Sequence, residues 1–426
     1  MPMGQSKKNI KIVIGANYGD EGKGSCVNHL SKSNSLVIRT NGGPQMGHTV
    51  YHDKKKHVFS NFASGTLKGA KTYIAGTAIV NPMTFKKEHR QLVKDGFVPK
   101  YYVSENCIVT TPFDMLVNQA SEISLGSNSY GSCGLGIWET VERNKLPKFS
   151  FRISDINPNK NGFVKLRVIL ERIKNDYFKN RLMEMLCGDK IPEPLDEVVD
   201  KDLITPYLKD VEYFFANVNV ISEDREESFV KSFNNIVFEN SQGLLLSQER
   251  ESIGEHVTPS YTGIKLPKEF IEKYKLDSEY KVSVYYCTRW YMTRHGNGAL
   301  KNQCTQHSLA DNIVDETNAP NDFQGSIRFA RLDLEELIGR IKKDFGESEW
   351  QINLAVSCLG QNLAMLSKQR FGVTVYRHPV ISCGVKKNLS YNRLTDEFYS
   401  LMIANFDNFG NIYQNNLYNF QGIFRV

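Results

Sequence analysis

This sequence of 426 residues lacks the features that mark membrane, secreted and nucleic-acid-binding proteins. No apolar stretch reaches the roughly 18 residues that a membrane-spanning helix needs. Residues 1–11 are polar and lack the apolar core of a signal peptide. The net charge of +6 suits an anionic small molecule as well as nucleic acid, but long basic runs are absent. We therefore expect a cytoplasmic protein with small-molecule substrates, no nucleic-acid partner and no membrane association.

Paired cysteines, repeats and linkers are missing as well. No two of the eight cysteines form a CxxC pair, which argues against a zinc ribbon and for free thiols in a reducing compartment. We find no internal repeat, no low-complexity tract and no linker rich in Pro, Gly or Ser. The sequence therefore predicts a single domain over residues 1–426. The cysteines are Cys26, Cys107, Cys133, Cys187, Cys287, Cys304, Cys358 and Cys383.

Short β-branched runs alternate with helix-forming segments along the chain. Residues 8–15 have the pattern of a buried strand, 25–32 that of a helix and 36–39 that of a second strand. This order predicts an α/β fold with a large, mostly parallel central sheet flanked by helices, related to P-loop folds. Residues 163–227 are charged and helix-forming, and we interpret them as a helical insertion within that domain. Further strand candidates are 73–79, 236–239, 281–288 and 352–357.

A glycine-rich loop, GANYGDEGKG at 15–24, follows the first predicted strand and precedes the first predicted helix. Glycines let backbone N–H groups close on phosphate oxygens, and the helix N-terminus and Lys23 add positive charge. The spacing between Gly15 and Gly22 is two residues longer than in a Walker A loop, and Gly24 replaces the metal-binding hydroxyl. Asp20 is thus a candidate metal ligand or base. The alternative is a turn residue that caps the helix.

A second loop, NGGPQMGHT at 41–49, also follows a predicted strand end, where ligands gather in parallel sheets. Its His48 lies among glycines and can approach a phosphate and act as an acid near neutral pH. A lone histidine is more often structural. The presence of the first loop favours the functional interpretation.

Together these two loops resemble those of the adenylosuccinate synthetase family. Further similar blocks follow in the expected order and extend the resemblance over nearly the whole chain: GTAIVNP (76–82), SEN (104–106), GSCG (131–134), ENSQG (239–243), VT (257–258) and TRHGNG (293–298).

The resemblance implies a ligase that joins L-aspartate to the 6-oxo position of a purine nucleoside monophosphate through a 6-phosphoryl intermediate, driven by hydrolysis of a nucleoside triphosphate. Asp20 would take the proton from N1, and His48 would stabilise charge on the transferred phosphoryl group. Mg²⁺, held by Asp20 and the Gly47 carbonyl, would bridge the phosphates. The resemblance also implies a homodimer in which Arg143 reaches into the partner's site.

The same resemblance assigns residues to four sets. The catalytic set is Asp20, Lys23, His48 and Gln242. The triphosphate-binding set is Gly19, Glu21, Gly22, Lys23, Gly24, Gly47, His48, Thr49, Ser357, Ser382 and Gly384. The acceptor-nucleotide set is Asn17, Gln45, Ser132, Cys133, Arg143, Gln242 and Thr258. The aspartate-binding set is Arg294, Gln324, Gly325 and Arg328.

Three departures from the family pattern bear on the substrates. Gly360 stands where the family has the aspartate that recognises guanine. Without that carboxylate, two buried hydrogen-bond donors of guanine would each lose a partner worth about 1–3 kcal/mol. This departure favours ATP. The loop at 321–333 lacks an arginine that the family uses towards aspartate and the ribose 2′-hydroxyl. TRHGNG resembles the archaeal and bacteriophage branch, part of which condenses aspartate with dGMP using ATP.

These departures favour dGMP with ATP, and IMP with GTP is the close alternative. Some members of that branch replace the loop aspartate with serine, whereas this chain keeps Asp20. If a phage encodes the chain, its compartment would be the host cytoplasm. Two other classes stay open, a GTP-binding switch without ligase activity and a catalytically inactive relative.

Overall fold

The computed structural model describes residues 8–421, apart from 53–54, 127–128, 157–159, 187–189, 194, 200, 250–255, 310–312, 314–324, 359–379, 383–384, 388–408 and 417–418. Within these residues the chain builds a ten-stranded sheet in the order β19-β18-β15-β11-β1-β10-β2-β5-β7-β9. All neighbouring strands run parallel except β18 and β19. The prediction of an α/β fold with a large, mostly parallel sheet is confirmed.

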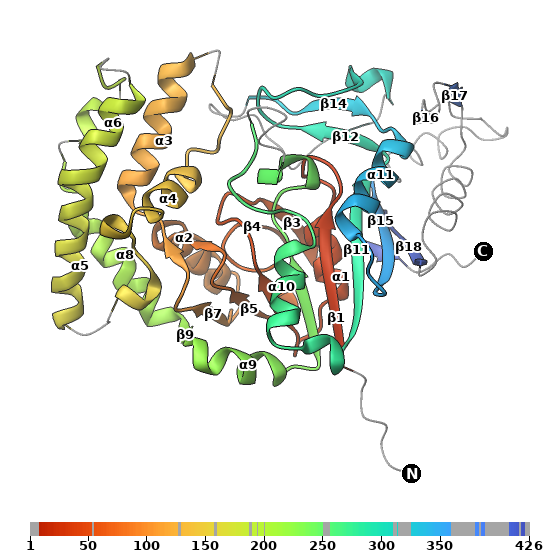
Figure 1. Ribbon diagram of the computed structural model, residues 1–426, viewed down its shortest axis with the longest axis horizontal. Coiled ribbons are helices and arrows are strands. Elements are labelled where there is room, and N and C mark those ends of the chain that lie inside the picture. The colour runs from red at the N-terminus through yellow and green to blue at the C-terminus, as the bar shows by residue number, and fades with distance from the viewer. Residues whose placement is uncertain are drawn as a thin grey trace, which may run out of the picture.

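The strands of this sheet alternate with helices and turns along the chain (Figure 1). Their bounds are β1 Asn9–Gly15, β2 Leu36–Arg39, β5 Lys71–Ile74, β7 Tyr101–Ser104, β9 Asn219–Ile221, β10 Asn235–Glu239, β11 Lys281–Arg289, β15 Gln351–Ser357, β18 Phe409–Asn416 and β19 Asn419–Gln421.

One strand prediction, at 73–79, was wrong in its extent. The sheet strand β5 ends at Ile74, and a turn follows in which Ala78 N donates to Ala75 O at 2.9 Å. The glycine at 76 and the threonine at 77 form this turn, so the chain leaves the sheet. β6 (Ile79–Val80) then pairs with β8 (Ile108–Val109) in a separate two-stranded sheet.

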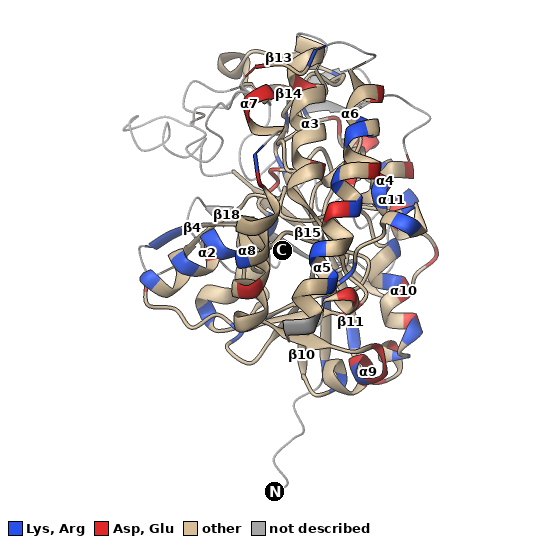
Figure 2. Ribbon diagram, turned by 90° about the vertical axis from the view of Figure 1, so that its left-hand side faces the viewer, with Lys and Arg blue, Asp and Glu red and all other residues tan. Residues whose placement is uncertain are grey.

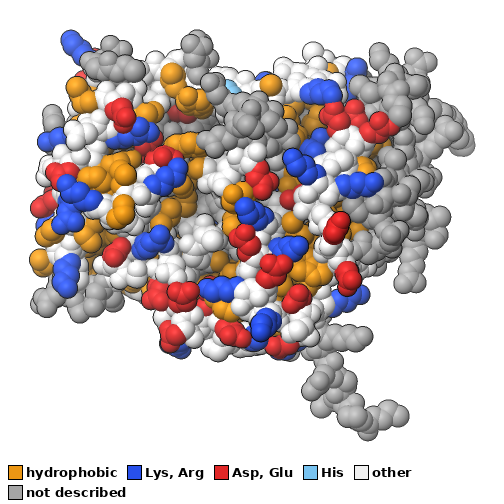
Figure 3. All heavy atoms as spheres, in the orientation of Figure 1, with side chains coloured by type: hydrophobic (Ala, Val, Ile, Leu, Met, Phe, Trp, Pro, Cys, Tyr) orange, Lys and Arg blue, Asp and Glu red, His pale blue; other side chains and the backbone are white. Residues whose placement is uncertain are grey.

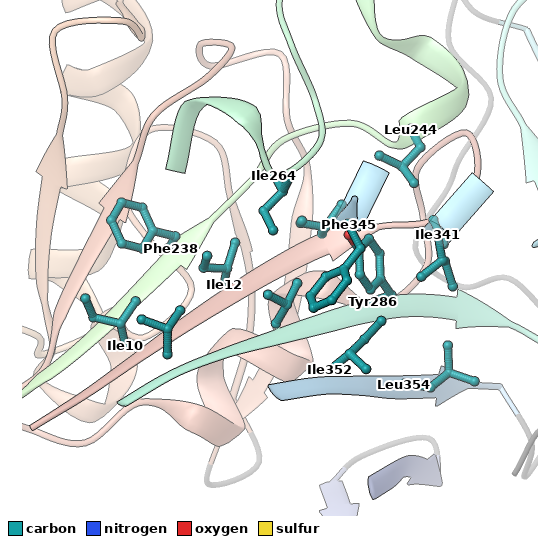
Figure 4. Close-up of a cluster of buried hydrophobic side chains, with 14 of the residues drawn as sticks. Ile10, Ile12, Phe238, Leu244, Ile264, Tyr286, Ile341, Phe345, Ile352 and Leu354 are labelled. Carbon is teal, nitrogen blue, oxygen red and sulfur yellow. The ribbon is translucent and has the colours of Figure 1, made fainter. Parts of the chain in front are cut away.

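Hydrophobic side chains cover both faces of the central sheet. Alternate residues of a strand point to opposite faces, so Ile12 of β1 packs with Ile271 of α10 (Lys265–Lys273) and Ile341 of α11 (Leu334–Phe345). Figure 4 shows this cluster around β1, β11 and β15. Val13 points to the other face and packs against Val27 of α1 (Lys23–Leu30). Both faces are buried, as parallel sheets require.

The stretch interpreted as a helical insertion holds α5 (Lys160–Arg172), a π-helical turn (Ile173–Phe178), α6 (Lys179–Met185), α7 (Asp196–Val199) and α8 (Ile204–Asn217). It also contains β9, which pairs with β7, and α9 (Glu223–Lys231), so this stretch supplies an edge strand of the main sheet as well. A second core joins these helices to α2 (Pro82–Lys94) and α3 (Pro112–Leu125). α4 (Ile137–Asn144) packs against α3, and its Glu139 pairs with Arg181 of α6 at 3.0 Å. Figure 1 shows α3, α4, α5, α6 and α8 grouped beside the sheet.

Smaller elements lie around the strand ends. β3 (His48–His52) and β4 (Lys55–Phe59) form a hairpin, β12 (Tyr291–Arg294), β14 (Arg328–Arg331) and β13 (Gln303–Cys304) form a three-stranded sheet, and β16 (Val380–Ser382) pairs with β17 (Val385–Lys387). Short 3-10 turns occur at Thr66–Lys68, Pro147–Phe149, Ile153–Asp155, Leu244–Leu246, Leu276–Ser278 and Gln306–Ser308.

The surface carries both charge signs and some exposed apolar side chains. Figure 2 shows Lys and Arg concentrated over β4 and α2, where Lys55 Nζ donates to Asp95 O at 2.7 Å and Lys86 pairs with Asp210 at 2.6 Å. Figure 3 shows apolar side chains on the part of the surface formed by the helical group. Among the described residues, no helix has both the length and the hydropathy that crossing a bilayer requires. The exposed apolar residues of α3 to α6 include Ile123, Leu125, Trp138, Val164, Val168 and Met183.

Candidate active site

The loop between β1 and α1 has a backbone shape that most side chains disfavour. Gly19 and Gly22 have φ values of 102° and 82°, and the non-glycine Asp20 has a φ of 61°. Gly22 caps the N-terminus of α1, and a Cβ there would lie 3.1 Å from the Ser357 Cβ. The loop lies at the carboxyl end of a central parallel strand, which is the usual ligand position in such sheets. The predicted phosphate loop thus has the conformation that its glycines favour.

Glu21 and Lys23 form a buried ion pair inside this loop. Lys23 Nζ lies 3.0 Å from Glu21 Oε2, and each side chain is only 2% exposed. The other oxygen, Oε1, accepts from Asn17 N at 2.9 Å and Gly19 N at 2.8 Å. The Glu21 carboxylate therefore fixes the loop from within, whereas the sequence predicted that it binds the triphosphate. A Cβ at Gly15 would lie 2.8 Å from Lys23 Nζ, so this position requires glycine.

Asp20 directs its carboxylate to the rim of the site, where its side chain is 23% exposed. Its Oδ2 lies 3.3 Å from His295 Nε2, and its backbone carbonyl accepts from Arg289 Nε at 2.5 Å. Burial alone would raise the pKa of Asp20, but contact with His295 and the charges of Arg289 and Lys23 bring the pKa below its ordinary value. Asp20 is therefore ionised at neutral pH, as a base or metal ligand must be.

His48 stands at the start of β3 and is held by a carboxylate. Its Nδ1 lies 2.6 Å from Oε1 of the fully buried Glu239, whose other oxygen accepts from Ser64 N at 2.9 Å; the Ser64 hydroxyl also donates to Oε1. Burial lowers the pKa of His48, and the opposing effect of Glu239 does not outweigh it. A Cβ at Gly24 would lie 2.8 Å from the His48 Cβ, so glycine there lets α1 approach the imidazole.

The charge of Lys23 acts on both Asp20 and His48. After the larger effects of burial and of their direct partners, its positive charge lowers the pKa of both Asp20 and His48. The strand order explains this geometry, because β1 and β2, which precede the two loops, both pair with β10. Glu239 ends β10 and thus lies between the loops. In the sequence, Glu239 belongs to the ENSQG block, but no role was predicted for it. The signal that could have pointed to it is an acidic residue at the end of a buried strand.

The second loop places several predicted residues near the first. Gln45 Oε1 accepts from Gly43 N at 2.7 Å, and its buried Nε2 has no hydrogen-bond partner among the described residues, which leaves a donor for a ligand. Gly47 is exposed and Thr49 is half-buried.

The loop after β10 packs against the phosphate loop. Gln242 has a φ of 62°, and a Cβ at Gly15 would lie 2.8 Å from its carbonyl oxygen. A Cβ at Gly243 would lie 2.3 Å from Asn17 O, which explains the glycine there. Gln242 is thus brought to the carboxyl end of β1.

Three other predicted acceptor residues lie on loops that meet at the open edge of the site. Ser132 Oγ accepts from Asn118 Nδ2 at 2.9 Å, and burial raises the pKa of the neighbouring Cys133 to about 11, so that thiol is protonated at neutral pH. Thr258 is half-buried, and its backbone N–H donates to Leu246 O at 2.8 Å.

The predicted aspartate-binding arginines are direct neighbours. Arg294 of β12 and Arg328 of β14 are paired in the antiparallel register. The Arg294 guanidinium lies over the Tyr18 ring, 4.5 Å from its centre, and the buried Arg328 Nε has no hydrogen-bond partner within the part of the chain that the structure describes. Gly325 is exposed, with a φ of 63°, and Gln324 lies outside the described residues. Two guanidinium groups side by side suit a substrate with two carboxylates.

Some predicted residues are not free to meet a ligand in this structure. Arg143 is completely buried, and its Nε and Nη2 contact the Asp114 carboxylate at 2.8 and 2.9 Å. This placement conflicts with the expectation that Arg143 reaches out of the chain into a partner. Asn17 uses its side chain on Thr288 at 3.0 Å and Arg340 at 2.7 Å.

The remaining predicted triphosphate residues come from the later part of the chain. Ser357 is buried and donates to Glu21 O at 3.1 Å, so it supports the phosphate loop from below. Ser382 lies on β16, and Gly384 falls outside the described residues.

Comparison with known proteins identifies the family. Residues 12–323, more than half of the chain, match the family described as "Adenylosuccinate synthetase". The chain belongs to the adenylosuccinate synthetase family.

Individual relatives are distant and match only part of their length. The chain is 30% identical over 241 residues to adenylosuccinate synthetase of Buchnera aphidicola subsp. Schizaphis graminum, covering 55% of this chain and 52% of that one. It is 34% identical over 237 residues to the enzyme of Microcystis aeruginosa, covering 55% and 50%. The chain thus spans about half the length of the curated relatives it matches.

Two solved structures of the family share the fold. Adenylosuccinate synthetase of Plasmodium falciparum superposes with a TM-score of 0.60 at 16% identity, covering 83% of this chain and 77% of that one. Succinoaminodeoxyadenylate synthetase of cyanophage S-2L gives a TM-score of 0.52 at 14% identity, covering 85% and 89%. At these identities the likeness concerns the fold alone.

Proposed function

We propose that this chain is a ligase that condenses L-aspartate with the 6-oxo position of a purine nucleoside monophosphate. Hydrolysis of a nucleoside triphosphate to the diphosphate and phosphate would drive the reaction through a 6-phosphoryl intermediate. One observation carries the proposal: Asp20 and His48, each held by its own partner, follow neighbouring parts of the sheet at its carboxyl edge, and both are affected by the positive charge of Lys23.

Asp20 would start the first step as a base. Its lowered pKa keeps the carboxylate ionised, so it can accept the proton from purine N1. The electron pair of the N1–H bond then forms an N1=C6 double bond, and the pair of the C6=O6 double bond moves to O6, which attacks the terminal phosphorus as the bond to the leaving diphosphate oxygen breaks. Lys23 and the N-terminus of α1 would hold the phosphates, because both present positive charge.

His48 would act on the transferred phosphoryl group. The contact with Glu239 fixes the ring through Nδ1, so Nε2 is the nitrogen available to the phosphoryl oxygens. Burial lowers the pKa of His48, and the negative charge of bound phosphates would raise it again. An imidazolium formed in this way donates a hydrogen bond to charge that develops on the transferred group.

The residues at Asp20 fit a magnesium ion. Mg²⁺ is usually bound through one or two carboxylates together with substrate phosphates, and Asp20 offers an ionised, partly exposed carboxylate at the edge of the phosphate loop. Asp20 and the carbonyl of the exposed Gly47 would hold the ion. When bound, Mg²⁺ would offset the negative charge of the phosphates.

The second step would use the paired arginines. Arg294 and Arg328 would orient aspartate through its carboxylates, so that its amine attacks C6 and the phosphate on O6 leaves. Gln45, with its unsatisfied buried amide, and Gln242 would contact the acceptor nucleotide.

We favour dGMP as acceptor and ATP as donor. The support is the glycine at 360 in place of the guanine-reading aspartate, and a loop at 321–333 with fewer arginines than the family pattern. The cyanophage S-2L enzyme of similar fold was solved with dGMP and with dATP as an energy donor, which is compatible with this choice. The alternative is IMP with GTP.

A homodimer and a cytoplasmic location complete the proposal. The exposed apolar residues of the helical group, including Trp138 and Val168, suit an interface between two copies. Sedimentation of the wild type and of Trp138→Lys tests this part, since the variant should shift towards the monomer.

A two-by-two nucleotide comparison tests the activity. The protein is mixed with aspartate and Mg²⁺, with dGMP or IMP and with ATP or GTP, and both phosphate release and the mass of the product are followed. The highest rate with dGMP and ATP is expected. A preference for IMP with GTP would identify the conventional reaction, and no release with any pair would favour a non-catalytic relative.

A further inference from the structure

The loop at 294–298 contacts the phosphate loop, the loop that carries Ser132 and Cys133, and the predicted aspartate-binding residue Arg328. His295 lies against Asp20 of the phosphate loop. Asn297 Nδ2 donates to Ser129 O at 2.9 Å, and a Cβ at Gly131 would lie 2.6 Å from the Gly296 Cα, so this loop packs on the acceptor loop. Such contacts join segments that are more than 160 residues apart in the chain.

The same loop is tied to the aspartate-binding arginines. Arg328 Nη2 donates to Gly296 O at 2.6 Å and also to Gly298 O. Arg294 directly precedes His295 and lies over the ring of Tyr18, which belongs to the phosphate loop. The position of His295 is therefore determined by residues that are proposed to bind aspartate.

We propose that His295 is a positioning residue that holds the Asp20 carboxylate through Oδ2 and links its orientation to the aspartate subsite. The inference rests on the proposed function. Asp20 is a loop residue with a positive φ, and its side chain is partly exposed. Without the contact with His295 its carboxylate could rotate. With Oδ2 against the imidazole, Oδ1 is the oxygen directed to ligands.

This arrangement has a chemical consequence. Activation of O6 without bound aspartate would waste the triphosphate, because the phosphorylated purine could then react with water. The orientation of Asp20, the base, depends on the loop at 294–298, which is connected to Arg294 and Arg328. Asp20 is therefore best placed when bound aspartate orders those arginines. The contact thus favours phosphoryl transfer in the complete complex.

A matched pair of amide variants tests the role of His295. Glutamine places its amide nitrogen near the position of the imidazole Nε2, whereas asparagine is too short to reach Asp20. We expect His295→Asn to lower kcat by about 10- to 100-fold with little change in the KM of the triphosphate, and His295→Gln to recover most of the rate. His57→Asn, on β4, serves as a control and should match the wild type.

Two results would overturn the inference. Equal kcat values for the Asn and Gln variants, with equal thermal unfolding midpoints, would show that the contact with Asp20 does not matter. A proportional rise of every KM with unchanged kcat would indicate a structural role for the loop only. If the wild type turns over and His295→Asn equals it, this inference alone fails, whereas an inactive wild type contradicts the proposed function and the inference with it.

Discussion

His48 Nδ1 lies 2.6 Å from Glu239 Oε1, although 191 positions separate the two residues in the chain. Ser64 holds the same carboxylate through its backbone N–H and its hydroxyl. A carboxylate that fixes an imidazole selects its tautomer and the direction of its other nitrogen. The proposed phosphoryl-stabilising group is thus oriented by a residue on a different strand.

Replacement of Glu239 by glutamine should impair turnover more than folding. Glu239→Gln keeps the shape but removes the charge that opposes the lowering of the His48 pKa, and kcat should fall about 10- to 100-fold. Glu226→Gln is the control, because Glu226 is also a buried acid but contacts Tyr73 and Tyr274 away from the site. Wild-type rates in Glu239→Gln would show that the pair with His48 has no catalytic role.

Asp20→Asn should abolish activity and leave the fold intact. Asparagine tolerates a positive φ, so the backbone at 61° stays accessible, but the amide cannot accept the proton from N1. Loss of a general base costs about 10²- to 10⁴-fold in rate. Phosphate release and circular dichroism measure the two properties, and a variant that keeps its rate would refute the assignment of the base.

Arg143 should matter for stability, not for contact with a partner. Arg143→Met leaves the buried Asp114 carboxylate without its ion pair, which should lower the free energy of unfolding by about 3–5 kcal/mol. Adding Asp114→Asn should restore part of that loss, since the unpaired charge is removed. Urea unfolding gives both values. A variant of unchanged stability that loses activity would instead support the interface role predicted from the sequence.

Asp344 should stabilise the fold at acidic pH and lose this stabilising contribution as the pH rises. Burial raises the pKa of Asp344 to about 6, against the smaller lowering effects of the Tyr286 hydroxyl and the Ile264 N–H. A carboxyl whose pKa is raised on folding binds its proton more tightly in the folded state. Its contribution is therefore fully present below about pH 4 and is lost as the pH rises through about 6.

The measurement compares wild type and Asp344→Asn in urea between pH 4 and pH 7.5. The wild type should lose stability relative to the variant across this interval, because only the wild type has the ionising carboxyl. A constant difference between the two proteins would mean that Asp344 titrates at its ordinary pKa.

Short-range patterns in the sequence sufficed for the fold class and for both glycine loops. The apolar runs of β1 and β2 and the glycines at 19, 22 and 24 determine their own local geometry, so a prediction from neighbouring residues succeeds there. The direction of Glu21 was not predictable in this way, because it depends on which backbone amides the loop leaves for its carboxylate.

Long-range contacts account for the rest of the site. Glu239 reaches His48 through the order of strands in the central sheet, and His295 reaches Asp20 from the end of β12, a strand of a separate sheet; one sequence specifies neither arrangement. Arginine is usually a surface residue, but in this fold the Arg143 guanidinium contacts Asp114 and two backbone carbonyls in the interior. The edge strand β9 is only three residues long, too short for its alternation to show within a helical stretch.

β10 lies between β1 and β2 in the sheet but follows both in the sequence, and this order has a consequence for biosynthesis. A ribosome translates both glycine loops before the strand that separates them, because Glu239 at the end of that strand follows His48 by 191 positions. Nascent chains that end between His48 and β10 contain Asp20 and His48 without the strand that spaces them. Polypeptides released early would therefore carry the two signature motifs and still lack a nucleotide site.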